Sequence, residues 1–145
     1  MRRDGRLSRM LHVLVHMDKR GGKATSETIA LMLGTNPVVV RRTMGTLKAA
    51  GIVSSEGGHG GGWTLVRDLG AITVRDVYLA LGAPPALALE AATDHSSCPV
   101  EQSAVAALET IFGETEAFML LRMGEISLAD IGQDFERRVR LAQPR

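Results

Sequence analysis

One short segment near the middle of the chain restricts the fold more than any other. Residues 57–62 read Gly-Gly-His-Gly-Gly-Gly, and five glycines in six positions neither favour a helix nor supply side chains to a core. The flanking segments 52–55 and 63–66 are short and contain β-branched or aromatic residues, as strands do. The pattern therefore predicts a β-hairpin with a glycine-rich tip.

Before this hairpin, the sequence predicts three helices. Apolar residues recur at helical spacing over 6–19, and a shorter helix should follow over 26–33. Asn36 is a favoured N-cap residue and Pro37 a favoured first helical residue, so a third helix should run from there to about residue 50. Two helices joined by a short turn and followed by a hairpin are typical of a winged helix-turn-helix.

The second half of the chain also has helical patterns. A capping-box-like sequence starts a helix over 73–81, apolar spacing predicts a long helix over 99–123, and a last helix should begin near residue 127. Pro84-Pro85 indicates a mostly irregular connector after the first of these, with room for a helical piece at 86–92. The expected fold class is therefore mainly α with a small β-hairpin.

The two halves of the chain carry opposite charge, although the whole chain has a formal net charge of only +1. Residues 1–67 contain eleven Lys and Arg against four Asp and Glu, whereas residues 68–145 contain six against twelve. This distribution is expected when only one half of a protein meets an anionic polymer. Chance clustering of charge on two solvated faces is the alternative.

The third predicted helix is the best candidate for reading double-stranded DNA in the major groove. Arg41 or Arg42 can pair with guanine, Val38 or Val39 can touch a thymine methyl, and Lys48 can meet a phosphate. The glycine-rich tip should approach the DNA backbone or the minor groove. The predicted DNA-contacting residues are Ser26, Asn36, Val38, Val39, Arg41, Arg42, Lys48, His59, Gly60 and Gly61.

Two other functional classes fit the sequence less well than DNA binding does. A winged helix can serve as a protein-interaction module, but that use favours an apolar or acidic third helix, and this one carries Arg41, Arg42 and Lys48. A phosphate-binding nucleotide loop requires the glycines to lead into Gly-Lys-Ser/Thr and a helix, which they do not. The sequence shows no catalytic constellation either, so we expect no enzyme.

These features together predict how the chain is organised. We expect a winged helix-turn-helix DNA-binding domain over 1–82, a connector over 83–98 and a helical dimerisation region over 99–145. The apolar stripe of the long helix is wider than one chain of this size needs for its own core, which favours a homodimer joined near 99–123. The residues of this stripe are Val105, Leu108, Phe112 and Phe118.

Two stretches of sequence resemble one family specifically. LKAAGIVSSEGGHGGGWTLVRD and AITVRDVYLALG are similar to the iron–sulfur-regulator family (IscR/NsrR-type, "Rrf-two") of bacterial winged-helix repressors. The resemblance spans roughly residues 6–82 and is weaker towards the end of the chain. It implies a homodimer that binds a pseudo-palindromic operator, usually as a repressor.

The chain departs from this family in its cysteines. Members that bind a cluster have three cysteines in or near the connector, whereas this chain has only Cys98. Because a cluster needs about four ligands, we expect no cofactor and no metal, and a site shared by His95 and Cys98 of two chains is the alternative. Cys98 should lie at the start of the long helix, where it is either a redox sensor or a small, partly buried structural residue.

The expected location of the protein is the cytoplasm. The sequence does not show a signal peptide, because the apolar stretch after the first charged residues is broken by His12 and His16. No segment approaches the roughly 20 consecutive apolar residues of a membrane span.

Overall fold

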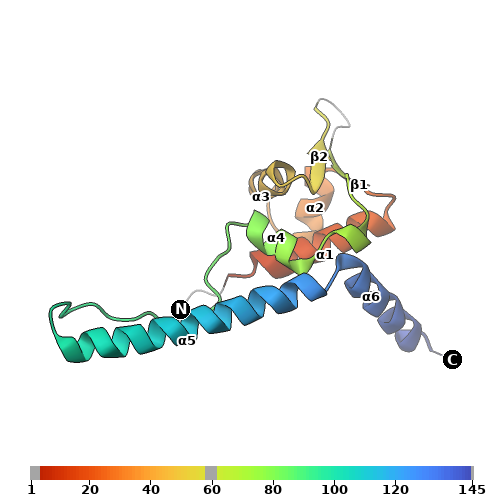
Figure 1. Ribbon diagram of the computed structural model, residues 1–145. Coiled ribbons are helices and arrows are strands. Elements are labelled where there is room, and N and C mark those ends of the chain that lie inside the picture. Colours follow the sequence, from red (N-terminus) through yellow and green to blue (C-terminus); the bar gives the residue numbers. More distant parts are fainter. Residues whose placement is uncertain (1–3, 58–61, 145) are drawn as a thin grey trace.

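The computed structural model describes residues 4–57 and 62–144, and it places a small winged-helix body beside one long helix (Figure 1). Predictions that concern His59, Gly60 and Gly61 therefore lie outside the described residues. The elements in chain order are α1 (Arg6–Lys19), β1 (Lys23–Ala24), α2 (Ser26–Leu33), α3 (Pro37–Ala49), β2 (Val53–Ser55), β3 (Trp63–Leu65), the 3-10 turn η1 (Leu69–Ala71), α4 (Val74–Ala80), α5 (Pro99–Glu125) and α6 (Leu128–Ala142).

The predicted hairpin is part of a three-stranded antiparallel sheet. Its strands lie in the order β1-β3-β2, with Val53 opposite Leu65 and Lys23 opposite Thr64. Sequence analysis missed β1, which has only two residues. Gly62 allows its close approach to the hairpin, because a Cβ atom there would lie 2.7 Å from the carbonyl oxygen of Ala24.

The core of the body is built from leucine, isoleucine, valine and methionine side chains. Val40, Met44 and Leu47 were predicted as the inner face of the third helix, and all three are buried. They pack in one cluster with residues of α1, α2, α4 and the sheet. Leu128, the first residue of α6, belongs to the same cluster and is fully buried.

Two matching helix starts attach the C-terminal part of the chain to the body. Thr73 caps α4 and Ser127 caps α6, each in a capping box with an aspartate three residues later. The two caps form a β-bridge, flanked by hydrogen bonds of 2.9 Å from Val74 N to Ile126 O and from Leu128 N to Ile72 O. As a result, α6 returns to the body and packs against α1 and η1.

The connector and α5 extend away from the body (Figure 1). The expectation of a helical piece at 86–92 was wrong, because these residues form no helix. Seven residues form a helix only with support from packing, and Leu87 and Leu89 of this segment stay 42% and 69% exposed, although they line a pocket together with α5. The turn into the connector uses two consecutive left-handed residues, Gly82 at φ 85° and Ala83 at φ 50°.

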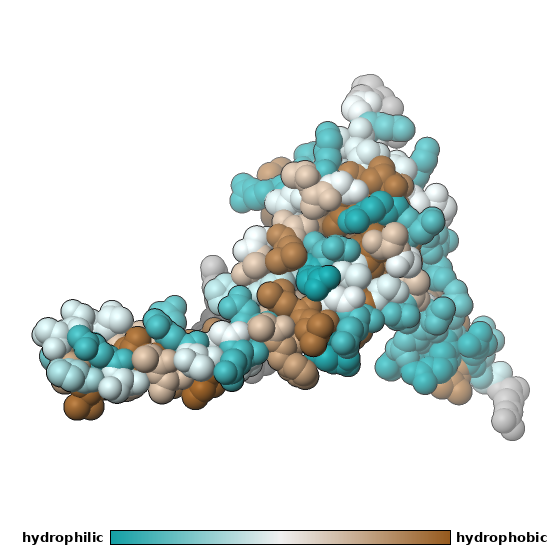
Figure 2. Space-filling model, in the orientation of Figure 1, coloured by the Kyte–Doolittle hydropathy of each residue, from teal (hydrophilic) through white to brown (hydrophobic). Residues whose placement is uncertain are grey.

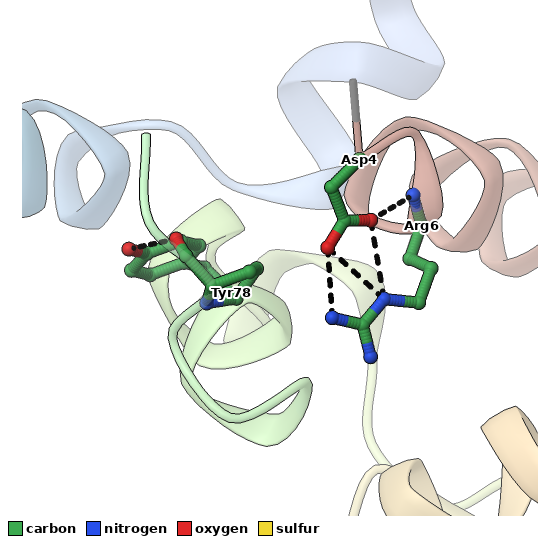
Figure 3. Close-up of polar contacts among 4 residues, drawn as sticks. Asp4, Arg6 and Tyr78 are labelled. Carbon is green, nitrogen blue, oxygen red and sulfur yellow. Dashed lines mark hydrogen bonds and ion pairs between the residues drawn. The ribbon is translucent and has the colours of Figure 1, made fainter. Parts of the chain in front are cut away.

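The start of α1 is marked by a local ion pair. The Asp4 carboxylate accepts hydrogen bonds from the backbone N–H of Arg6 at 3.0 Å and from its guanidinium at 2.7 Å (Figure 3). These hydrogen bonds lower the pKa of Asp4 to about 2. The pair is largely exposed to solvent and therefore orients the helix start more than it stabilises the fold.

Candidate nucleic-acid interface

The outer face of α3 combines apolar and cationic side chains in contact with solvent. Val38 and Val39 are 62% and 48% exposed, although both are β-branched apolar residues. Arg41, Arg42 and Lys48 are exposed on the same helix. Since the inner face of α3 is completely buried, the helix is held rigidly while this outer face remains free for a partner.

Asn36 caps the N-terminus of this helix. Its side-chain oxygen accepts a hydrogen bond of 3.1 Å from the backbone N–H of Val39, and Pro37 follows as the first helical residue. This geometry is the N-cap that the sequence predicted. Asn36 is exposed, so it fixes where α3 begins and still lies at the edge of the outer face.

Two of the three cations on α3 are held by neighbouring elements. The Arg41 guanidinium forms an ion pair of 3.2 Å with Glu27 of α2. The Lys48 ammonium donates a hydrogen bond of 2.7 Å to the Ser55 hydroxyl at the end of β2. Lys48 is thereby directed towards the base of the hairpin, which suits a residue that contacts the DNA backbone.

The structure places Ser26 away from the outer face. Ser26 is 8% exposed, and its hydroxyl accepts a hydrogen bond of 2.9 Å from the indole N–H of Trp63. A buried indole N–H needs such a partner, so this bond joins α2 to β3. Sequence reasoning missed the pair because the two residues are 37 positions apart.

A groove of about 460 Å³ lies between α2 and the base of the hairpin. Arg20 and Lys23 line it together with Thr25 and Thr28 of α2. Thr25 caps α2 and its hydroxyl lies 3.0 Å from that of Thr28. Sequence reasoning did not single out these cations, and it did not predict β1, which pairs Lys23 with Thr64 of the hairpin beside this groove.

Cys98 occupies the N-cap position of α5, as expected from the Cys-Pro sequence. It is half-buried, and its thiol forms no capping hydrogen bond. The nearby Glu101 carboxylate instead accepts hydrogen bonds of 2.9 and 3.0 Å from the backbone N–H of His95. This arrangement fits both alternatives for Cys98, so its role as a redox sensor stays a prediction.

An exposed cationic helix on a helix-turn-helix body, beside a glycine-rich hairpin, defines a winged-helix DNA-binding regulator. Comparison with known proteins identifies the family. A model for Rrf2, described as an iron-dependent transcriptional regulator, matches residues 4–134. The chain belongs to the Rrf2 family of transcriptional regulators, which confirms the resemblance found in the sequence, and it is a DNA-binding transcriptional regulator.

Individual relatives agree with this assignment. The chain is 33% identical over 130 residues to a Bacillus subtilis protein named provisionally as the HTH-type transcriptional regulator YwnA, covering 88% of this chain and 95% of YwnA. A solved structure described provisionally as a DNA-binding protein is 32% identical with a TM-score of 0.67, covering 87% of this chain and 97% of that one. The IscR structure from T. potens has the same fold, with 19% identity and a TM-score of 0.69 over 99% of this chain and 94% of its own.

The residues of this chain do not match the iron named in the family description. A cluster requires about four ligands, mostly thiolates, and Cys98 is the single cysteine of the sequence. Within residues 4–57 and 62–144, no three His, Cys, Asp or Glu side chains are grouped to hold a metal ion.

Proposed function

We propose that this regulator binds a pseudo-palindromic operator as a homodimer and represses transcription, with α3 of each protomer in the major groove. The observation that carries this proposal is the outer face of α3, where exposed valines and arginines stand on a rigid helix. The two adjacent exposed valines form a small apolar surface beside the arginines, and thymine methyl groups in the major groove offer a surface that matches it.

The contacts of α3 divide the roles of its residues. Arg42 extends into solvent and forms no ion pair with any residue that the structure describes, so it is the better candidate for pairing with guanine. Arg41 reaches the DNA only if its guanidinium divides its hydrogen bonds between Glu27 and the DNA, or if the ion pair with Glu27 breaks. Lys48 is directed to the base of the hairpin, where it contacts the DNA backbone and positions the protein on the DNA. Ser26 is left out of the proposed contacts because its hydroxyl is buried against Trp63.

The dimer contact is proposed on α5, along a stripe that differs from the predicted one. Val105 and Phe112 are half-buried, and Phe112 faces the connector. A second set is spaced three or four residues apart, as in a coiled coil, except for one step of seven residues across Glu114. It is exposed on the surface of α5, where Figure 2 shows hydrophobic side chains. The residues of this α5 stripe are Val100, Ala104, Ala107, Ile111, Phe118 and Leu121.

The same proposal places the protein in the cytoplasm, where it meets DNA, and gives it no enzymatic role. No helix of the described residues is long and apolar enough to cross a membrane. Repression, rather than activation, is what the family resemblance implies.

The test is a selection of bound fragments from sheared genomic DNA by the purified protein, repeated with the Arg42→Ala variant. The parent should return fragments with an inverted repeat whose half-sites lie about one helical turn apart, and affinity should fall steeply with salt. Arg42→Ala should lose about 1–3 kcal/mol of specific binding and relax the sequence preference at one position. Retention of no DNA by the parent would favour a protein-interaction module instead.

The direction of regulation requires a second measurement. The selected operator should overlap the promoter that it controls, and adding the protein should lower transcription from that promoter in a purified system. An increase in transcription would show that the protein is an activator, without affecting the DNA-binding proposal.

A further inference from the structure

A cavity of about 270 Å³ lies between the connector, α4 and α5. The connector residues Pro85 and Leu87 line it on one side, Tyr78 of α4 on a second, and Phe112 and Met119 of α5 on a third. A single water molecule occupies about 30 Å³ of liquid, whereas small-molecule sites begin at about 300 Å³. The cavity is therefore much larger than one water molecule and lies just below the usual lower size of a small-molecule site, which suits a small organic molecule.

The wall that the connector contributes is held in place by specific contacts. The Tyr78 hydroxyl donates a hydrogen bond of 2.7 Å to the carbonyl oxygen of Pro84 (Figure 3). The backbone N–H of Ala83 donates to Tyr78 O at 3.1 Å, while Ala83 itself is left-handed at φ 50°. A residue with a side chain adopts this conformation at a cost of about 1 kcal/mol, so the surroundings of Ala83 enforce the turn that brings the connector over α5.

The charge around the cavity selects the kind of molecule that fits. Between Arg75 and Arg122 the sequence contains no Lys or Arg and has seven Asp and Glu. One of them, Glu116, lines the cavity. The pKa of Tyr78 is raised by burial and, to a smaller extent, by the Glu116 carboxylate, which places both groups in one electrostatic environment. An anion would be repelled here, whereas a cation would be attracted.

We propose that this cavity is a binding site for a small apolar cation, with an aromatic or aliphatic group among Pro85, Leu87, Phe112 and Met119 and an ammonium group facing Glu116. The ring of Tyr78 adds a favourable surface for a cation. The site is compatible with the dimer proposed above, because Phe112 and Met119 point about 100° around α5 from Ile111 and Phe118 of the α5 stripe. It goes beyond DNA binding and does not depend on that activity.

The probe for the test is benzyltrimethylammonium, and the readout is the methyl NMR signal of Met119 in protein labelled with methyl-¹³C methionine. The Met119→Leu variant assigns the signal. During titration the Met119 signal should shift and saturate, while the signals of Met10, Met17 and Met44, which lie in the core of the body, should stay in place. A Met119 signal that does not move at tens of millimolar probe would overturn the proposal.

Matched variants test the role of charge. Glu116→Gln should weaken binding by about 2- to 5-fold, the range typical of a solvent-exposed ion pair. Glu109→Gln makes the same charge change two turns away on α5, about 10 Å along the axis, and should leave the affinity unchanged. Equal losses in both variants, or equal binding of the anion phenylacetate, would mean that no cation site exists in this cavity.

Discussion

The winged-helix body and α5 use apolar residues in opposite ways. In the body, α1, α3 and α4 each bury one face in a shared core, and eleven large side chains are less than 2% exposed. In α5, which the structure describes from end to end, no residue is buried, although the helix contains Ile111, Phe118 and Leu121. A row of exposed apolar side chains along a helix of 27 residues is typical of a surface that another molecule covers.

This difference is the physical basis for the proposed dimer. The body already buries one face of each of its helices in its own core. The α5 helix leaves a row of apolar side chains exposed, and the proposal places a second copy of the chain on that stripe. Variants of the two regions should therefore fail in different ways, one in folding and the other in assembly.

The largest effect is expected from a core residue that comes from the C-terminal region. Leu128→Ala should lower the free energy of unfolding by about 2–5 kcal/mol, because it leaves a cavity in the body core. Leu141→Ala on the same helix is the matched control, since Leu141 is 79% exposed, and should change stability by less than about 0.5 kcal/mol. Urea denaturation at one fixed protein concentration measures both. Equal stability of the two variants would show that Leu128 does not belong to the body.

A variant of the α5 stripe should affect assembly rather than folding. Phe118→Ala should raise the dimer dissociation constant by about 30-fold or more, as expected for a large aromatic side chain that is buried in an interface. Leu31→Ala is the control in the body, because Leu31 is 85% exposed on α2. Sedimentation of diluted samples gives the dissociation constants. A parent protein that is monomeric at every concentration would contradict the dimer itself.

The ion pair on the body surface should have a smaller effect, on DNA binding alone. Glu27→Gln removes a negative charge beside Arg41 and frees that guanidinium. We expect non-specific DNA affinity to rise by about 2- to 5-fold, the range of an exposed ion pair, and the preference for the operator to fall. Asp18→Asn makes the same charge change on α1 and should leave the preference unchanged. Titrations of operator and random DNA by fluorescence anisotropy test this, and an unchanged ratio would show that Glu27 does not restrain Arg41.

The smallest effect concerns pH and His16, which lines a groove between α1 and α6 together with His12 and Phe135. Burial, and then the nearby His12 and Arg20, lower the pKa of His16 from its ordinary value of 6.5. The unfolded chain therefore takes up a proton first as the pH falls through 6.5, so the folded state loses stability below that pH. His16→Gln should reduce the difference between the melting temperatures at pH 7.5 and pH 5.5. The same difference in parent and variant would exclude His16 as its cause.

Local signals predicted the helices well. Asn36-Pro37 predicted the start of α3, and the apolar spacing predicted α1 over the observed residues. The starts of α4 and α6 also lie where they were expected, capped by Thr73 and Ser127. Caps and periodicity act within a few residues, so one sequence contains them completely.

Features that depend on distant residues were missed. Strand β1 forms where Lys23 and Ala24 meet β3, and the buried Ser26 hydroxyl meets the indole of Trp63, 37 positions away. The predicted stripe of α5 mixed two faces, because helical spacing alone does not reveal that the connector covers Phe112. In the candidate interface, Arg41 and Arg42 looked equivalent until Glu27, 14 positions away, was placed beside one of them.

The position of Leu128 has a consequence for how the protein is made. During translation the amino-terminal helices emerge from the ribosome first, but their core lacks one of its fully buried side chains until residue 128 of 145 has been added. A truncated product that ends before α6 would have an incomplete core and be prone to degradation.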